Sequence, residues 1–393
     1  MDGGQLSAIR GARLFDGERF HEGPVLVLVD HGRITAVDCT GAAPPAGVAF
    51  IDLGDVTLMP GFVDAHTHLV WDPHGHPEAL ATTPDAVLLA RARQHARQAL
   101  QAGVTTVRDL GDRNFVTVTV STECRATPSA GAEILTAGPA ITRTDGHCWY
   151  LGSVADTSAD LVEAVTRRSE RGTQWVKIMA TGGFLTAGSD PFVPQYTTEQ
   201  LTVVVQTARR YHLPVTAHAH ATGGIANAIA AGVDGVEHCS FHTPHGPVLD
   251  QALIETMLAK GIWAGITIGR AQPRSHLPPA LVPMLEQRWT RIRTLVRAGV
   301  NFAFSTDAGI SATKPHDVLP AELTYAATQG LSNAVVLAAA TSQAAASCHC
   351  ADRKGHLKPG HDADILAIPG NPLHTIEAIL GPRAIFRLGH RIR

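Results

Sequence analysis

The sequence predicts an α/β protein, a (β/α)8 TIM barrel joined to a small β-sandwich domain built from both ends of the chain. From residue 58 onward, apolar and β-branched runs alternate with helical segments, which is typical of consecutive βα units and a parallel sheet. A glycine stands between several of these helices and the strand that follows. The two chain ends lack this alternation and show strand and turn patterns instead.

The N-terminal segment, residues 1–57, predicts short strands separated by turns. Residues 25–29 are an unbroken run of valine and leucine, typical of a buried strand. Residues 30–33 predict a tight turn in which Gly32 is available for a positive φ. Residues 33–37 are then the returning strand.

The C-terminal segment, residues 355–393, returns to β character after a turn-rich entry. Apolar runs at residues 363–368 and 384–388 predict two strands. We expect both chain ends to pair in one composite β-sandwich domain of residues 1–57 and 355–393. The barrel domain is then residues 58–354.

Eight strands are expected in the barrel domain, each an apolar run of strand length. They span residues 57–66, 104–109, 133–137, 174–180, 214–220, 234–239, 262–267 and 301–307. An open doubly wound sheet is the structural alternative. No glycine-rich phosphate-binding fingerprint follows the first strand, which disfavours a nucleotide-binding version of that alternative.

Two helices have clear starting signals. Thr83-Pro84 offers an N-cap and a proline at the first helical position before residues 85–101. Thr197 opens a capping box before residues 198–211. Helix ends are marked by Gly103, Gly172, Gly232, Gly261 and Gly299.

The composition excludes several classes of protein. The net charge is −3 and no basic stripe occurs, so nucleic acid is not an expected partner. No run of 18 apolar residues is present, which excludes a membrane-spanning helix. The N-terminus lacks a secretory signal pattern and the 6 cysteines form no C-x-x-C pair, so we expect a reduced, cytoplasmic setting.

Histidine, at 21 residues, is the unusual component, and it gathers at strand ends. His66 and His68 lie two residues apart at the end of the first expected barrel strand, so they point to the same face. His218 and His220 repeat this spacing at the end of the fifth strand. Neutral imidazole nitrogens at this spacing can converge on one metal ion.

Three further residues of ligand type lie on strands four, six and eight. Lys177 lies within the fourth strand, His238 ends the sixth and Asp307 ends the eighth. Each alone has a structural explanation, as a snorkelling lysine, a core histidine and a helix cap. Chemistry in such a barrel lies at the carboxyl ends of the strands, and the combination therefore favours a metal site there.

With these residues in place, the sequence resembles members of the amidohydrolase superfamily. Within it, the sequence is most similar to the imidazolonepropionase-like and Xaa-Pro dipeptidase (prolidase-like) branch with a binuclear metal centre. The resemblance covers nearly the whole chain. It rests on the motifs LMPGFVDAHTHL, WVKIMATGG, PVTAHAHATGGIANAIAAGVDGVEH, STDAG and LKPGHDADILAIPGNPL.

The resemblance implies two divalent metal ions as cofactors, with zinc as the usual ion. The implied ligands are His66, His68 and Asp307 for the first ion, His218 and His238 for the second, and an N6-carboxylated Lys177 that bridges them. A carbamate explains why a lysine can stand beside two metal ions. An ammonium group would be repelled by two dications, whereas a carboxylated amine is anionic.

The resemblance also implies residues that contact a small-molecule substrate. His147 matches a histidine that polarises the substrate carbonyl, although the surrounding sequence DGHCWY departs from the usual Gly-Gly-His-Gly. Tyr196 resembles a tyrosine near a substrate carboxylate. His220 is expected to face the substrate rather than to bind metal. The long segment 181–194 is suited to covering the site.

The implied activity is hydrolysis of an amide bond in a dipeptide or N-acyl amino acid, with Asp307 as the residue that accepts and returns a proton. A cyclic amide, carbamate or lactone is the alternative substrate. A deaminase is disfavoured because no glutamate follows the fifth-strand histidine and because Lys177 is present. A non-catalytic metal-binding scaffold remains a further alternative, and the sequence leaves open whether the chain forms a homo-oligomer.

Overall fold

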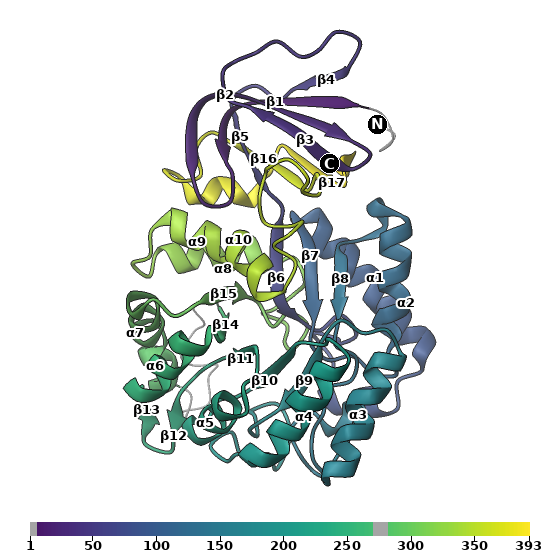
Figure 1. Ribbon diagram of the computed structural model, residues 1–393, viewed down its shortest axis with the longest axis vertical. Coiled ribbons are helices and arrows are strands. Elements are labelled where there is room, and N and C mark those ends of the chain that lie inside the picture. Colours follow the sequence, from purple (N-terminus) through teal and green to yellow (C-terminus); the bar gives the residue numbers. More distant parts are fainter. Residues whose placement is uncertain (1–5, 270–281) are drawn as a thin grey trace.

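The computed structural model describes residues 6–269 and 282–393, apart from the side chains of 282–286. Figure 1 shows a sheet from both chain ends at one end of the molecule and parallel strands with outer helices in the rest. This mixed α/β architecture confirms the predicted class.

Both chain ends contribute to one sheet, whose strand order is β18-β17-β16-β5-β1-β2-β3, with β4 paired to β1. β16 pairs antiparallel with β5, which joins the two ends of the chain. The division into two domains and the sandwich arrangement both stay predictions. The strands of the two chain ends are assigned to a single sheet rather than to two facing layers. The bounds are β1 Ser7–Phe15, β2 Phe20–Asp30, β3 Arg33–Asp38, β4 Ala49–Asp52, β5 Val56–Pro60, β16 Ile365–Pro369, β17 Ala384–Arg387 and β18 His390–Arg391.

The turn expected at residues 30–33 is confirmed. β2 ends at Asp30 and β3 begins at Arg33, so the loop has two residues. Both loop residues have positive φ, 47° at His31 and 76° at Gly32. This conformation matches the twist of the flanking strands.

All eight strands expected in the barrel domain are present. They form two parallel sheets, β6-β7-β8 and β15-β14-β11-β10-β9. Their bounds are β6 Phe62–Thr67, β7 Val104–Asp109, β8 Glu133–Thr136, β9 Val176–Met179, β10 Val215–His218, β11 Gly235–Glu237, β14 Trp263–Thr267 and β15 Phe302–Ser305.

Backbone hydrogen bonds cross both seams between the two parallel sheets. Beyond β15, the Asp307 amide donates to the His66 carbonyl at 2.8 Å. At the other seam, the Trp175 amide donates to the Thr136 carbonyl at 3.1 Å. The carboxyl ends of β6 and β15 therefore lie beside each other.

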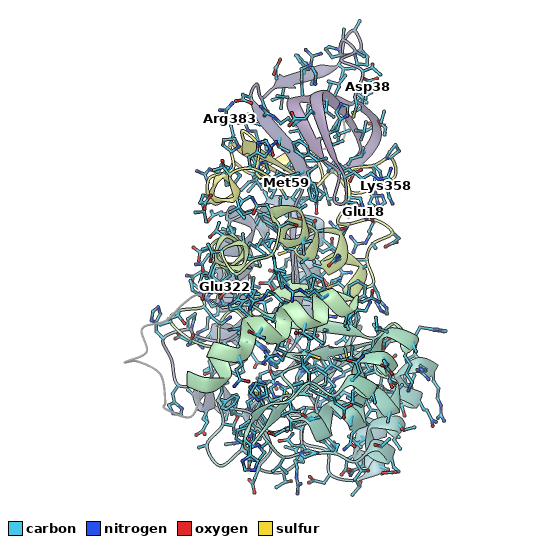
Figure 2. All side chains as sticks on the ribbon, turned by 90° about the vertical axis from the view of Figure 1, so that its left-hand side faces the viewer. Glu18, Asp38, Met59, Glu322, Lys358 and Arg383 are labelled. Atoms are coloured by element: carbon cyan, nitrogen blue, oxygen red, sulfur yellow. The ribbon has the colours of Figure 1, made fainter. Side chains whose placement is uncertain are left out.

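The first expected strand, 57–66, is two strands, and this is a correction. β5 pairs with β16 in the terminal sheet, whereas β6 pairs with β7, and Gly61 separates them. A Cβ at Gly61 would lie 2.2 Å from the Thr105 hydroxyl oxygen, so the chain approaches β7 closely here. Met59 lies where the terminal sheet meets the rest of the molecule (Figure 2) and is fully buried.

Ten α-helices occur in the described residues, and Figure 1 shows the first seven outside the parallel strands. They are α1 Asp85–Gln101, α2 Val116–Ala126, α3 Ser158–Glu170, α4 Thr198–Arg210, α5 Thr222–Ala231, α6 Gln251–Lys260, α7 Val282–Ala298, α8 Leu319–Ala327, α9 Asn333–Ala339 and α10 Ser342–Ser347. The described residues also contain a hairpin of β12 (His242–Thr243) and β13 (Gly246–Pro247). They contain the 3-10 turns η1 Pro77–Ala81, η2 Pro128–Ala130, η3 Trp149–Leu151 and η6 Ile376–Leu380 as well. Within the described ranges, no helix has the length and apolarity that crossing a membrane requires.

Most of the sequence signals for the starts and ends of helices are confirmed. The capping box at Thr197 is confirmed, and the five marked glycines all have positive φ. The N-cap expected at Thr83 is wrong, because Pro84 occupies the N-cap of α1. The Thr83 hydroxyl instead donates to the Ala79 carbonyl in the preceding turn, at 2.8 Å.

A buried charge cluster ties the C-terminal segment to β8. Lys354 lies 3.0 Å from Glu133, 2.8 Å from Asp362 and 2.6 Å from Asp364. Arg353 pairs with Glu133 and Asp362. Since Glu133 begins β8, these ion pairs connect the segment that leads into the terminal sheet with the parallel strands.

Candidate metal centre

The carboxyl ends of β6, β11 and β15 bring four predicted ligands together. Asp307 Oδ1 lies 3.4 Å from His66 Nε2 and 3.2 Å from His68 Nε2. His66, His238 and Asp307 each offer a donor atom within 4.8 Å of the others. The seam hydrogen bond from Asp307 to His66 explains this convergence, because it holds the end of β6 next to the end of β15.

A second group of donors comes from β10 and β11. His218, His220 and His238 each present a nitrogen within 4.8 Å of the others. The His220 ring stacks on His238 with 4.6 Å between centroids and lies 4.7 Å from His218. His220, which the sequence predicts to face substrate, is therefore as close to this group as the predicted ligands are.

Lys177 on β9 has an unusual environment. Its side chain is buried, and its Nζ has no hydrogen-bond partner in the described part of the chain. Burial lowers the pKa of this amine to about 8, against the opposing effect of the Glu237 and Asp307 carboxylates. An unpaired buried amine is unfavourable in itself, which indicates that a further group completes its environment.

The protonation states suit metal binding. Burial, and then the charge of Lys177, lowers the pKa of His66 to about 4. Burial and the neighbouring histidines hold the pKa values of His218 and His238 well below their usual range. Burial would raise the pKa of Asp307, but His66 and His68 outweigh it, so the carboxylate stays ionised. Neutral imidazoles and a carboxylate are the forms that coordinate metals.

Two of these residues have a backbone conformation that is rare for residues other than glycine. φ is 64° at His238 and 60° at Asp307, both in the left-handed region. Such conformations cost of order 1–3 kcal/mol and cluster at functional sites. His238 follows β11 directly and Asp307 lies two residues after β15, so both conformations occur at the point where the donors meet.

Glu237 holds His66 in place, and sequence reasoning missed it. Its carboxylate lies 2.9 Å from His66 Nδ1 and accepts hydrogen bonds from Arg108 at 2.8 Å and Thr216 at 2.7 Å. A Cβ at Gly265 would lie 2.2 Å from this carboxylate, so β14 leaves room for it. The bond to Nδ1 leaves His66 Nε2 free to face Asp307, an arrangement that commonly orients metal-binding histidines.

Arg108 completes this buried network. It donates to the Ala65 carbonyl at 2.7 Å and to the Ser347 carbonyl at 3.1 Å, and its guanidinium lies 4.3 Å from the Trp175 ring centroid. The available sequence signals were a charged residue inside the apolar run of β7 and a glutamate directly before His238. Neither signal identifies the partner, which lies on another strand.

His147 lies beside the cluster. Its ring centroid is 4.7 Å from that of His218, and its Nδ1 is 3.0 Å from the Thr186 hydroxyl. A Cβ at Gly183 would lie 2.4 Å from the His147 ring, so the segment predicted to cover the site closes onto this histidine. Burial lowers the pKa of His147 to about 3, which keeps the ring neutral.

Comparison with known proteins decides the family. The model of the amidohydrolase family matches residues 57–387. The chain belongs to the amidohydrolase family.

Individual relatives support this assignment. Ochratoxinase from Aspergillus niger is 28% identical over 369 residues, covering 84% of this amidohydrolase and 73% of the relative. Imidazolonepropionase from Saccharopolyspora erythraea is 28% identical over 245 residues, covering 55% and 57%. The crystal structure of a Xaa-Pro dipeptidase with bound methionine has a TM-score of 0.85 at 26% identity, covering 98% of this chain and 99% of that one.

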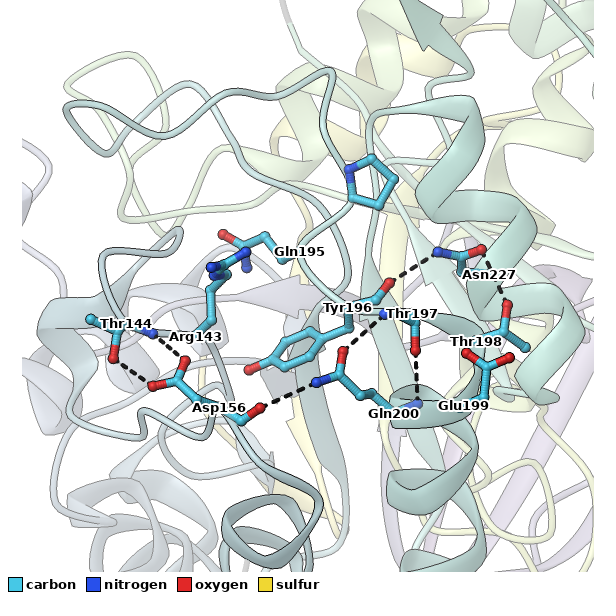
Figure 3. A pocket seen from close by; sticks show the side chains of 11 residues that line it. Arg143, Thr144, Asp156, Gln195, Tyr196, Thr197, Thr198, Glu199, Gln200 and Asn227 are labelled. Carbon is cyan, nitrogen blue, oxygen red and sulfur yellow. Dashed lines mark hydrogen bonds between the residues drawn. The ribbon is translucent and has the colours of Figure 1, made fainter.

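Tyr196 is less well placed for its predicted role in this amidohydrolase. Its hydroxyl donates to the Ala155 carbonyl at 2.8 Å. Its ring lines a separate cavity of about 800 Å³ between loops, together with Arg143, Asp156 and Gln200 (Figure 3). None of its hydrogen bonds between described residues reaches the histidine cluster, so its contact with substrate stays a prediction.

The amidohydrolase centre is open on one side. His66 and His218 are almost inaccessible, whereas His220 and His238 are half-buried. The exposed ring of Phe184 lies 5.0 Å from His220, between centroids. The donors are therefore least buried on the side of His220 and Phe184.

Proposed function

We propose that this amidohydrolase is a binuclear metal-dependent enzyme that hydrolyses an amide bond in a dipeptide or N-acyl amino acid. The single observation that carries the proposal is the buried Lys177 amine, which lacks a hydrogen-bond partner in the described residues and lies in a site with five side chains of metal-ligand type at strand ends. Relatives named ochratoxinase and Xaa-Pro dipeptidase support hydrolysis of this kind. The paired seams between the two sheets support a closed (β/α)8 barrel as the scaffold.

The donor set fits two divalent ions. His66, His68 and Asp307 would hold one, and His218 and His238 the other. The neutral fraction of the Lys177 amine would add CO₂ to form a carbamate with release of one proton, and the carbamate would bridge the ions. Histidine and carboxylate donors suit zinc. The close approach of His220 to the second group makes it a further candidate ligand.

The bound ions would supply Lewis acidity and a hydroxide nucleophile near neutral pH. Asp307 then accepts the proton of the nucleophile as it attacks the amide carbonyl, and it returns that proton to the leaving amine. Its position beside both His66 and His68 keeps it ionised for the first step. Both halves of the reaction therefore depend on one carboxylate.

His147 can stabilise the oxyanion through a ring N–H group. The Thr186 hydroxyl accepts a hydrogen bond from the Cys148 amide at 2.9 Å and can donate its own proton to His147 Nδ1 at 3.0 Å. In that tautomer Nε2 carries the ring proton. A neutral imidazole with Nε2–H is a donor for the developing negative charge on the carbonyl oxygen.

The test is release of free amino acid from a panel of dipeptides and N-acyl amino acids. The protein is loaded with zinc in bicarbonate buffer, and Asp307→Asn serves as the control. Release by the wild type alone supports amide hydrolysis. No release from any member, with two ions bound, contradicts it and favours a cyclic amide, carbamate or lactone.

A further inference from the structure

Arg288 and Arg291 lie about one turn apart on α7, and Arg288 reaches the edge of the donor group. Arg288 donates to the Thr267 carbonyl, and the Thr267 hydroxyl lies 2.9 Å from His238 Nδ1. Residues three apart share one face of a helix, so Arg291 follows Arg288 on this face. α7 also contacts β13, the second strand of the hairpin that begins at His242.

Arg291 is a buried cation with an unused donor. It is 8% exposed, and its Nη1 has no hydrogen-bond partner among the side chains and backbone groups that the structure describes. Burial lowers its pKa to about 10, so it stays charged at neutral pH. Burial lowers the pKa of His242 to about 4, and Arg291 adds to this effect, which indicates that the two side chains are close.

The carboxylates that act on the neighbouring Arg288 are engaged elsewhere. Glu322 pairs with Lys314 at 3.2 Å, and Asp307 is engaged by His66 and His68. His242 Nδ1 is a second buried polar atom without a hydrogen-bond partner in the described residues. Groups that are unfavourable for folding are retained where a ligand completes them.

We propose that Arg291, together with His242, forms an anion subsite that binds the free carboxylate of the substrate's amino acid portion. This inference rests on the proposed function and adds the residue that selects free acids. The guanidinium presents a planar pair of donors that matches a carboxylate.

The contact of His242 with His220 fits an α-amino acid, because the nitrogen and the carboxylate of such a substrate share one carbon atom. The His242 ring stacks on His220 with 5.6 Å between centroids, and His220 stacks on His238 at 4.6 Å. The subsite is therefore adjacent to the second donor group and on its open side.

The test compares an N-acyl amino acid that the wild type cleaves with the same compound bearing a carboxamide. Arg291→Met should lower kcat/KM for the acid by about 100-fold, mainly through KM, and change that for the carboxamide by less than about 2-fold. Arg297→Met removes an exposed arginine of the same helix and should change neither. Equal losses on both substrates would overturn the subsite.

Thermal unfolding separates a ligand role from a structural one. Removing an unpaired buried charge should leave the midpoint of Arg291→Met equal to or above that of the wild type. A lower midpoint or an unfolded variant would indicate a structural role and contradict the proposal. Arg291→Lys, which keeps the charge without the planar fork, should retain the fold and lose about 10-fold on the acid alone.

A failure of the proposed amide hydrolysis can be distinguished from a failure of the anion subsite. If the wild type cleaves neither compound, the amide-hydrolase proposal fails, and the subsite is tested by calorimetric binding of an N-acetyl amino acid to the metal-free protein. Binding to the wild type that Arg291→Met loses supports the subsite. No binding to the wild type, or equal binding to both proteins, overturns it.

Discussion

Glu237 should control both the stability of the fold and the affinity of the proposed metal centre. The side chain is 1% exposed and meets three partners, His66 Nδ1, Arg108 and Thr216. In Glu237→Gln the volume is kept and the negative charge is lost. A glutamine has one acceptor oxygen, so its amide N–H group would face Arg108 or His66, of which Arg108 is only a donor.

The magnitude follows from these contacts. Removing one partner of a buried ion pair costs about 3–5 kcal/mol of unfolding free energy. Arg108 keeps its bonds to two backbone carbonyls, so we expect the lower end, about 3 kcal/mol. Loss of the group that orients a metal-binding histidine typically weakens metal affinity by about 10- to 100-fold.

Urea unfolding of the metal-free proteins measures the first effect, and zinc competition with a chromophoric chelator measures the second. The matched control is Glu123→Gln, because Glu123 pairs with Arg93 on the surface, where 40% of its side chain is exposed. This control should change stability by less than about 0.5 kcal/mol. Wild-type stability and zinc affinity in Glu237→Gln would refute the reasoning.

Three further predictions concern catalysis, the bridging ligand and pH. Asp307→Asn should keep the fold but lower kcat by about 1,000-fold in steady-state kinetics at matched metal content, and near-wild-type turnover would contradict the proton-transfer role. Lys177→Ala should lose activity that added acetate partly restores, and no restoration by short carboxylates would argue against a carbamate. Burial would raise the pKa of Glu133, but Lys354 and Arg353 outweigh it, so the carboxylate stabilises the fold above about pH 4.5 and this contribution is lost as the pH falls. Glu133→Gln should therefore flatten the acid side of the stability curve by up to about 1.4 kcal/mol per pH unit, whereas parallel curves would contradict the effect.

The sequence predicts the strands and the positions of the ligand-type residues along them well, because both depend on local patterns. Each expected strand of the barrel domain is found, and the ligand-type residues lie at the ends of those strands or within them. The carboxyl ends of neighbouring parallel strands meet at one edge, so position along a strand is enough to predict that His66, His238 and Asp307 converge.

The features that the sequence does not predict depend on contacts between residues that are far apart in the chain. The break at Gly61 is decided by pairing of β5 with β16, about 300 residues later, which no local pattern shows. The partner of Glu237 is 171 positions away, at His66. The sequence places Arg291 on a helix, but whether a carboxylate lies opposite it follows only from the packed structure.

The most direct test of the account is the number of metal ions bound per chain. The wild type and Lys177→Met would be purified from zinc-supplemented bicarbonate medium, and zinc and protein would be quantified by elemental analysis. We predict two equivalents in the wild type and one or fewer in Lys177→Met, with both proteins folded. One equivalent or none in the wild type, or two in both proteins, would contradict a binuclear centre bridged by Lys177.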